Sequence, residues 1–184
     1  MTVRSFLFVP GDSERKMAKV GGGPADALIL DLEDSVAQDR LPVARGMVLE
    51  YLKAHPDRSR QQLWVRCNPL ETPLALPDLA AVVAGAPDGI VLPKTYSAAE
   101  AVRLDHYLSA LEAREGLPVG STRMLVVATE TARSLFTLES FVGAKGAATY
   151  QVYDSVAISV GDDAELTNEV TARLEREEAL RATG

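Results

Sequence analysis

The sequence is poor in the side chains that build disulfides and zinc sites. Cys67 is the single cysteine, so an internal disulfide is excluded and a reducing compartment, the cytoplasm, is favoured. His55 and His106 are the two histidines, and both lie in segments with a helical, exposed pattern. A zinc site of histidine and cysteine and a serine hydrolase triad are therefore not expected. Any metal should be a hard ion that carboxylates bind.

Positive charge and long apolar runs are also scarce. The 184 residues carry a net charge of −7, which argues against a nucleic-acid partner. No apolar run approaches about 18 residues, and residues 1–4 show no signal-peptide pattern, so we expect no membrane association and a cytoplasmic location. With 47% hydrophobic and 24% charged residues, the chain is long enough for one well-filled globular core.

Residues 25–36 combine an apolar run with an abrupt acidic end. Residues 27–30 have no polar alternation, which is typical of a strand buried on both faces of a parallel sheet. Asp31, Glu33 and Asp34 then follow within four residues, and such carboxylates repel one another unless they have partners. A helix N-terminus, where acids are favourable, is the alternative interpretation.

Strands and helices alternate along the chain with a repeat of roughly 30 residues, the pattern of a parallel sheet with right-handed crossovers. Strands are expected at residues 4–9, 27–30, 63–69, 90–92 and 124–128, and helices at 41–55, 77–85 and 97–115. A further helix, capped by Asp12 or Ser13, should end before Gly21. Periodicity alone leaves open a (β/α)8 barrel or an open doubly wound sheet. Four successive strands end in polar residues, and this distribution favours the α/β barrel, a TIM-type fold that draws its site from many strand ends.

The polar residues at these strand ends suit a magnesium site for a 2-oxo acid. Glu130, Glu33 and Asp34 offer the carboxylate oxygens that Mg²⁺ prefers. Arg66 offers a planar two-pronged donor for a substrate carboxylate. A metal and an arginine on one rim would chelate a 2-oxo acid and stabilise an enolate.

Three further residues near the strand ends have less specific interpretations. Lys94 could neutralise an acid or act as a Schiff-base nucleophile, and the ion pair is favoured because its neighbours show nothing that would desolvate it. Cys67 should face away from Arg66 as a small core residue. Trp64, two residues before Arg66, should share its face and pack inside the barrel.

Five motifs in register resemble the citrate lyase β-subunit family, relatives of malyl-CoA lyase. The first two are Arg4-Ser5-x-Leu7-Phe8-Val9-Pro10-Gly11, with Arg15 and Lys19 after it, and Ala25-Asp26-x-x-Ile29-Leu30-Asp31-Leu32-Glu33-Asp34-Ser35-Val36. The others are Val65-Arg66-x-Asn68-Pro69, Asp88-Gly89-Ile90-x-Leu92-Pro93-Lys94 and Glu130-Thr131-Ala132. The resemblance covers residues 4 to about 142.

The resemblance implies a (β/α)8 barrel, magnesium dependence and a homo-oligomer, a trimer or hexamer, with possible lyase-complex subunits. It implies cleavage or condensation of C–C bonds in citryl- or malyl-type acyl thioesters, carried by coenzyme A or an acyl carrier, with oxaloacetate or glyoxylate as the oxo acid. Arg66, Glu130 and Asp34 would be catalytic: Glu130 binds magnesium, and Arg66 holds the oxo-acid carboxylate. Glu33, Asp34 and Lys94 would surround the metal and its waters. Arg15 and Lys19 would bind coenzyme phosphates.

The resemblance weakens after residue 142. The family's second magnesium ligand, an aspartate in Gly-x-x-Asp-Leu, is not found where residues 151–156 should supply it, and residues 161–166 imitate it loosely. We expect that a strand, a helix and the metal-binding aspartate of the family are missing at 143–146, through a gap or splice in the sequence. Residues 147–184 would then be a later strand–helix unit of one barrel domain spanning 1–184, and the sequence would be part of a longer chain. The alternative function is a non-catalytic acyl-CoA or oxo-acid binding module on a degenerate or truncated barrel.

Overall fold

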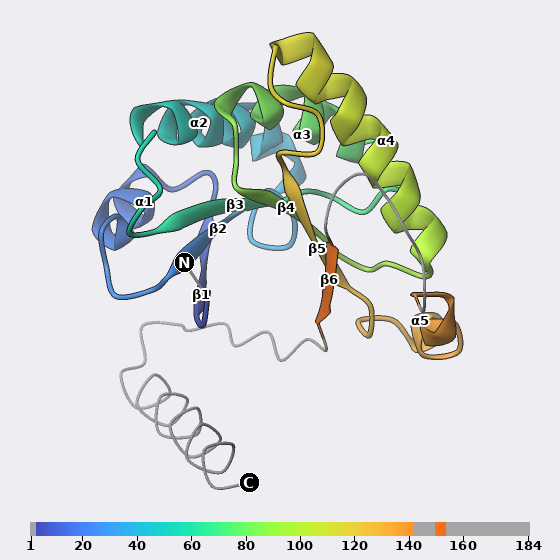
Figure 1. Ribbon diagram of the computed structural model, residues 1–184. Helices are drawn as coiled ribbons and strands as arrows, with labels where there is room; N and C mark the ends of the chain where they lie inside the picture. The colour runs from blue at the N-terminus through green and yellow to red at the C-terminus, as the bar shows by residue number, and fades with distance from the viewer. Residues whose placement is uncertain (1–2, 142–149, 154–184) are drawn as a thin grey trace, which may run out of the picture.

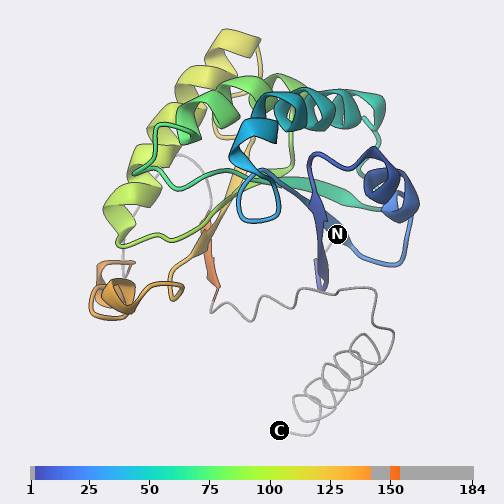
Figure 2. The same cartoon turned by 180° about the vertical axis from the view of Figure 1, so that it is seen from behind.

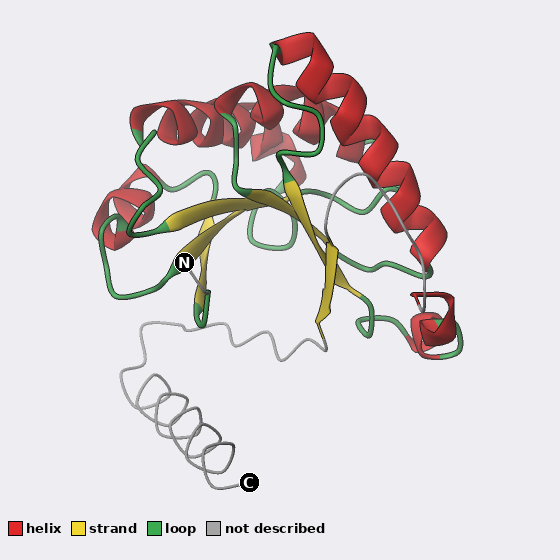
Figure 3. Ribbon diagram, viewed as in Figure 1, coloured by secondary structure: helices red, strands yellow, loops and turns green. Residues whose placement is uncertain are grey.

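The computed structural model describes residues 3–141 and 150–153, which form a curved, wholly parallel sheet (Figure 1 and Figure 3). The sheet contains β1 to β6 in the order of the chain. Neighbouring strands pair in parallel, from β1 with β2 through β5 with β6. The strand bounds are Phe6–Pro10, Ala27–Asp31, Gln62–Arg66, Gly89–Leu92, Arg123–Val127 and Tyr150–Tyr153.

The helices that connect β1 to β5 lie together on one side of the sheet (Figure 1 and Figure 2). A doubly wound sheet reverses its strand order and carries helices on both faces, whereas sequential strands with helices outside form the wall of a TIM-type barrel. The structure thus confirms the barrel arrangement for the described residues. The α-helices are α1 Glu14–Val20, α2 Leu41–Ala54, α3 Ala75–Val82, α4 Ala98–Glu115 and α5 Ala132–Leu135, and the 3₁₀ helices are η1 Gln38–Arg40, η2 Val83–Gly85 and η3 Leu138–Phe141.

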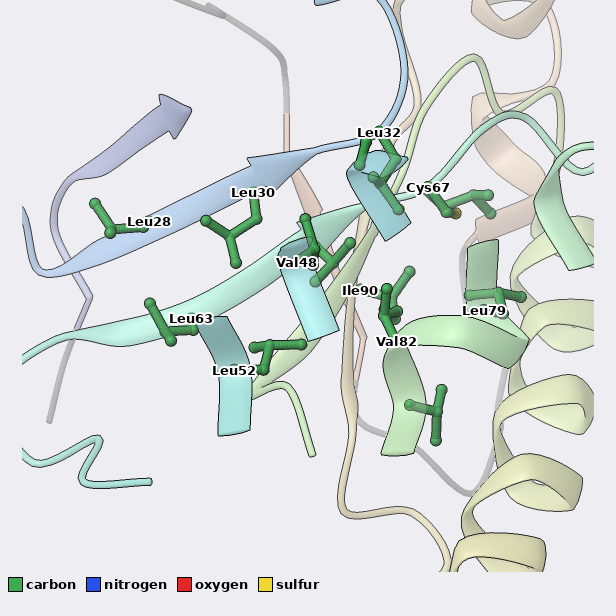
Figure 4. Close-up of a cluster of buried hydrophobic side chains, with 14 of the residues drawn as sticks. Leu28, Leu30, Leu32, Val48, Leu52, Leu63, Cys67, Leu79, Val82 and Ile90 are labelled. Atoms are coloured by element: carbon green, nitrogen blue, oxygen red, sulfur yellow. The ribbon is translucent and has the colours of Figure 1, made fainter. Parts of the chain in front are cut away.

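The larger core lies between the outer face of the sheet and the helices (Figure 4). Because side chains alternate along a strand, every second residue of β2 and β3 points toward α2 and α3. Cys67 belongs to this outer core and is fully buried, as predicted. The fully buried side chains of the cluster include Leu28, Leu30, Leu32, Val48, Leu52, Leu79 and Ile90.

A smaller cluster lies on the inner face of the sheet, which would be the inside of the barrel. It contains Trp64 with Ala27, Ile29, Val91 and Leu125. Trp64 lies on the same face as Arg66, two residues further along β3, as the alternation predicts. Along the inner face, the side chains therefore change from apolar in the middle of the strands to polar at their C-terminal ends.

The ends of several helices differ slightly from the sequence expectation. α3 begins at Ala75 rather than at residue 77, because Pro77 is tolerated in the first helical turn. Ser13 precedes α1 but makes no side-chain capping bond. Ser97 and Glu100 form a capping box at the start of α4, and Gly116 ends that helix at φ 72°.

The later part of the chain is described for β6 alone. The backbone of β6 pairs in parallel with β5. The expected junction at 143–146 and most of the expected unit 147–184 lie outside the described residues. Among the residues that the structure describes, no helix has the length and apolar character needed to cross a membrane.

Candidate functional site

The parallel strands bring five predicted site residues to one edge of the sheet. We call these residues, Glu33, Asp34, Arg66, Lys94 and Glu130, the C-terminal rim. Arg66 is the last residue of β3, and each of the others follows the C-terminal end of β2, β4 or β5. Contacts between rim residues cross the sheet from β2 to β5, so four strands contribute to one site.

Arg66 is held by Asp31, a carboxylate outside the set of predicted site residues. Asp31 Oδ1 accepts from Arg66 Nε at 2.7 Å, and Asp31 Oδ2 accepts from Nη2 at 2.7 Å. The two residues pair across β2 and β3, and the Asp31 side chain is 1% exposed. Burial raises the pKa of Asp31, but the hydrogen bonds and charge of Arg66 outweigh it and hold that pKa below its usual value.

Glu33 lies on another side of the same guanidinium. Its Oε2 is 3.3 Å from Arg66 Nη1, and its side chain is 4% exposed. Burial raises the pKa of Glu33 despite its cationic neighbours. Phe8 packs under the guanidinium, with Arg66 Cζ 4.7 Å from the ring centroid.

These contacts change which N–H groups of Arg66 can bind a substrate carboxylate. The edge formed by Nε and Nη2 binds Asp31 rather than pointing to solvent. A guanidinium has five N–H donors, so N–H groups of the terminal nitrogens remain for a substrate carboxylate. The sequence predicted the residue, whereas the structure decides which of its edges a ligand could reach.

Lys94 connects three strand ends at once. Its Nζ donates to Glu33 Oε1, and to Asp34 Oδ1 at 2.9 Å. Its backbone N–H donates to Glu130 Oε2 at 2.7 Å. Partial burial lowers the pKa of Lys94, but the hydrogen bonds to Glu33 and Asp34 raise it above its usual value. The structure thus supports the ion-pair interpretation, since a Schiff-base nucleophile needs a neutral amine.

The backbone of Lys94 is in the left-handed region, at φ 51°, which residues other than glycine rarely adopt. We expect Lys94→Gly to be more stable than Lys94→Ala by about 1 kcal/mol, because both lose the ammonium and glycine alone avoids the left-handed penalty. Urea unfolding of the two variants measures this difference. A higher stability of Lys94→Ala would show that φ relaxes on substitution and that the backbone is not held at this position.

Glu130 is exposed beyond the end of β5 and meets part of the requirement for magnesium. Mg²⁺ commonly takes one or two carboxylates and fills its octahedron with waters and substrate oxygens. Glu130 can supply one such carboxylate, while Lys94 engages Glu33 and Asp34. Within residues 3–141 and 150–153, no three metal-binding side chains cluster. The later aspartates considered for the second ligand, at 154 and 162–163, lie outside the described residues.

The two cations predicted for coenzyme phosphates lie on α1. Arg15 and Lys19 are both exposed, and neither forms an ion pair within the part of the chain that the structure describes. α1 starts near the strand ends and runs away from them, so Arg15 lies nearer the C-terminal rim than Lys19 does. The structure does not bring either residue into contact with the rim.

Asp31 could have been found from the sequence by its position. It follows Ile29 by two residues, so it shares the inner face with Trp64 and Arg66, and it ends its strand as Arg66 does. Asn68, from the motif at residues 65–69, bridges the loops after β2 and β3, because its Nδ2 donates to Leu32 O at 2.7 Å. The same Nδ2 donates to Asp78 Oδ2, in α3, at 2.8 Å.

Comparison with known proteins matches the sequence and the fold to the same group. The chain is 40% identical over 124 residues to citrate lyase subunit beta of Escherichia coli, covering 67% of this chain and 41% of that protein. It is 39% identical over 97 residues to (3S)-malyl-CoA thioesterase of Cereibacter sphaeroides, covering 53% and 34%. The chain spans less than half the length of these curated relatives.

A solved structure of CitE from Mycobacterium tuberculosis, in complex with magnesium and acetoacetate, has a TM-score of 0.57 and 30% identity and covers 78% of this chain and 51% of that one. The family model described as HpcH/HpaI aldolase/citrate lyase matches residues 4–162. That span includes the C-terminal rim and all six described strands. The chain therefore belongs to the HpcH/HpaI aldolase/citrate lyase family, a family of enzymes.

Proposed function

We propose that this chain carries the site of a magnesium-dependent carbon–carbon lyase that acts on a citryl- or malyl-type acyl thioester. The 2-oxo acid released or condensed would be oxaloacetate or glyoxylate. The observation that carries the proposal is the C-terminal rim, where Lys94 joins the carboxylates that follow β2 to Glu130 and a half-buried Arg66 lies beside them. A thioester substrate is supported by the similarity to (3S)-malyl-CoA thioesterase. Magnesium and an oxo acid are supported by the solved CitE structure, which contains magnesium and acetoacetate.

Each rim residue would have a distinct task. The remaining N–H groups of Arg66 bind the oxo-acid carboxylate, and Asp31 fixes the plane of the guanidinium. Glu130 binds magnesium, which when bound supplies a Lewis acid for the carbonyl oxygen. Asp34 and Glu33 would lie around the metal as hydrogen-bond acceptors, while Lys94 limits their mutual repulsion. Arg15 and Lys19 attract the phosphates of the thioester carrier.

The test is the coupling between magnesium and an oxo acid. We expect magnesium to strengthen binding of oxaloacetate by about 5- to 150-fold, the usual range for two coupled ligands. Glu130→Gln should remove this enhancement and leave the magnesium-free affinity unchanged, because the amide keeps the size but not the charge. Isothermal titration calorimetry with and without magnesium measures both quantities.

A matched control is Glu139→Gln, an exposed carboxylate on η3 a few residues further along. It should keep the full enhancement by magnesium. If magnesium has no effect on oxo-acid binding by the unaltered protein, the lyase proposal is wrong.

A non-catalytic acyl-CoA or oxo-acid binding module is the second candidate. The observation that favours it is that the Lys94 ammonium already pairs with Glu33 and Asp34, which leaves Glu130 as the one carboxylate of the C-terminal rim that this ammonium does not engage. Such a module would bind the oxo acid or the thioester with no dependence on magnesium, so the same titration separates the two functions.

The assembly and location of the protein follow the same proposal. We propose a homo-oligomer, a trimer or hexamer, with lyase-complex subunits as further partners and either coenzyme A or an acyl carrier bearing the thioester. The buried, unpaired thiol of Cys67 is consistent with a cytoplasmic location. We further propose one barrel domain across residues 1–184.

A further inference from the structure

A buried carboxylate on α3 lies behind the C-terminal rim. Asp78 is 0% exposed, and its carboxylate accepts hydrogen bonds from Arg45 and Asn68. Asp78 Oδ1 accepts from Arg45 Nε at 2.8 Å. Asp78 Oδ2 accepts from both the backbone N–H and the Nδ2 of Asn68, each at 2.8 Å. A buried charge is tolerated at this position because a cation and two N–H donors surround it.

Asn68 connects Asp78 to the loop after β2, which carries two residues of the C-terminal rim. Its Nδ2 has two hydrogens, and they are donated to Asp78 Oδ2 and to the carbonyl of Leu32 at 2.7 Å. The opposite orientation of the amide would place an oxygen against two acceptors, so the hydrogen bonds decide the orientation. Leu32 immediately precedes Glu33, and Asn68 follows Arg66 by two residues.

A further bond completes a closed connection between the two loops. The backbone N–H of Leu32 donates to Arg66 O at 2.9 Å. The loop after β2 is thus attached to the end of β3 by a backbone hydrogen bond and to the loop after β3 by the Asn68 amide. Asp78 holds that amide from behind.

We propose that Asp78, acting through Asn68, is a positioning residue that fixes the loop carrying Glu33 and Asp34 relative to Arg66, and so holds Glu33 against the guanidinium. The functional part of this inference rests on the function proposed above, whereas the positioning itself can be measured without it. Without the Asp78 anchor, Asn68 loses two hydrogen bonds, both to Oδ2 of Asp78, and the Leu32 carbonyl loses a fixed donor. The loop after β2 is then held less firmly, and its carboxylates move more freely relative to Arg66.

A comparable carboxylate elsewhere provides the control. Glu112 is also 0% exposed and accepts from the backbone N–H groups of Gly120 and Thr122, each at 2.7 Å. These bonds hold the loop before β5, at the opposite end of the strand from the rim. Glu112→Gln therefore removes a buried charge with backbone partners and leaves the rim untouched.

The first experiment compares amide hydrogen exchange in Asp78→Asn and Glu112→Gln with the unaltered full chain. Asp78→Asn should raise exchange about tenfold at residues 32–35, as expected for the loss of about one hydrogen bond. Glu112→Gln should raise exchange at 117–122 and leave 32–35 unchanged. Equal exchange at 32–35 in both variants would overturn the proposal.

The second experiment measures oxo-acid affinity in magnesium. Asp78→Asn should weaken oxaloacetate binding about tenfold or more, as removal of an outer partner does at other sites, whereas Glu112→Gln should leave it within about twofold. Faster exchange at 32–35 with unchanged affinity would overturn the link to binding. If the unaltered protein fails to bind oxaloacetate, the proposed function fails, and exchange alone still decides the positioning.

Asn68→Ala serves if Asp78→Asn does not fold. It removes the amide that reaches Leu32 while Asp78 keeps Arg45 and the backbone N–H of residue 68. The same rise in exchange at 32–35 is expected. Unchanged exchange in this variant would show that the amide does not hold the β2 loop.

Discussion

Asp31→Asn is expected to lower the free energy of unfolding by about 3 kcal/mol and to weaken oxo-acid binding. Removing one partner of a buried ion pair costs about 3–5 kcal/mol, because the other charge stays buried without full compensation. The lower end applies because Glu33 remains 3.3 Å from Arg66 Nη1. The guanidinium would then turn toward Glu33, away from the orientation that Asp31 enforces. Urea unfolding of the variant and the unaltered chain measures the change in the free energy of unfolding.

A matched variant at the other end of the same strand separates this effect from loss of any acidic residue. Asp26 pairs with Arg4, whose side chain is 72% exposed, so Asp26→Asn should cost about 1 kcal/mol. A cost at Asp31 no larger than at Asp26 would contradict the interpretation of Asp31 and Arg66 as a buried pair.

The pH dependence provides an independent check on Asp31. Its folded-state pKa is lowered, so the stability that it contributes is fully present above its unfolded pKa of about 4 and is lost as the pH falls through the folded value. The difference in stability between the unaltered chain and Asp31→Asn should therefore shrink below about pH 4. A difference that stays constant into acid would show that ionisation of Asp31 is not what stabilises the pair.

Gly89→Ala is expected to lower the free energy of unfolding by about 3 kcal/mol. A Cβ at this position would lie 2.7 Å from Cη2 of Trp64 and closer still to Cζ3 and Cε3. The indole cannot easily move, because its Nε1 donates to Gln62 at 3.0 Å and Arg123 stacks on its face, 4.9 Å from the centroid. Overpacking in a filled core costs about 1–3 kcal/mol, and a rigid neighbour favours the upper end.

Gly46→Ala is the control for the Gly89 prediction. Gly46 lies in α2, and a Cβ there meets nothing within 4 Å, so alanine should stabilise the protein by about 0.5–1 kcal/mol through helix propensity. Trp64→Leu should relieve part of the cost of Gly89→Ala in the double variant. If the two substitutions at 64 and 89 are additive in thermal unfolding, the clash with the indole is not the cause.

Much of the candidate site could be predicted because strand ends carry it. Arg66, Lys94 and Glu130 each follow an apolar run, and parallel strands bring such positions to one edge. The pairing of Asp31 with Arg66 could not be predicted as firmly, since it requires the register between β2 and β3. The role of Asp78 was out of reach, because it reaches the rim from α3 through Asn68 and lies in a segment that reads as an ordinary helix.

The fold shows the same division. The alternation of apolar runs predicted parallel strands and helices, yet left a barrel and an open sheet equally compatible with the periodicity. The strand order from β1 to β6, with helices on one side, decided for the barrel. Strand order is a property of which runs lie beside one another, and periodicity within a run contains no information about its neighbours.

The sequence by itself determined the kinds of chemistry available: one thiol, two histidines, and carboxylates with an arginine and a lysine at strand ends. These exclusions and candidates depend on side-chain type and local pattern alone. Only the tertiary structure decided which groups neutralise one another, as Asp31 does for Arg66 and Lys94 does for Glu33 and Asp34. The physical reason is that charge pairing and desolvation depend on distances between residues that are 35 or more positions apart in the chain.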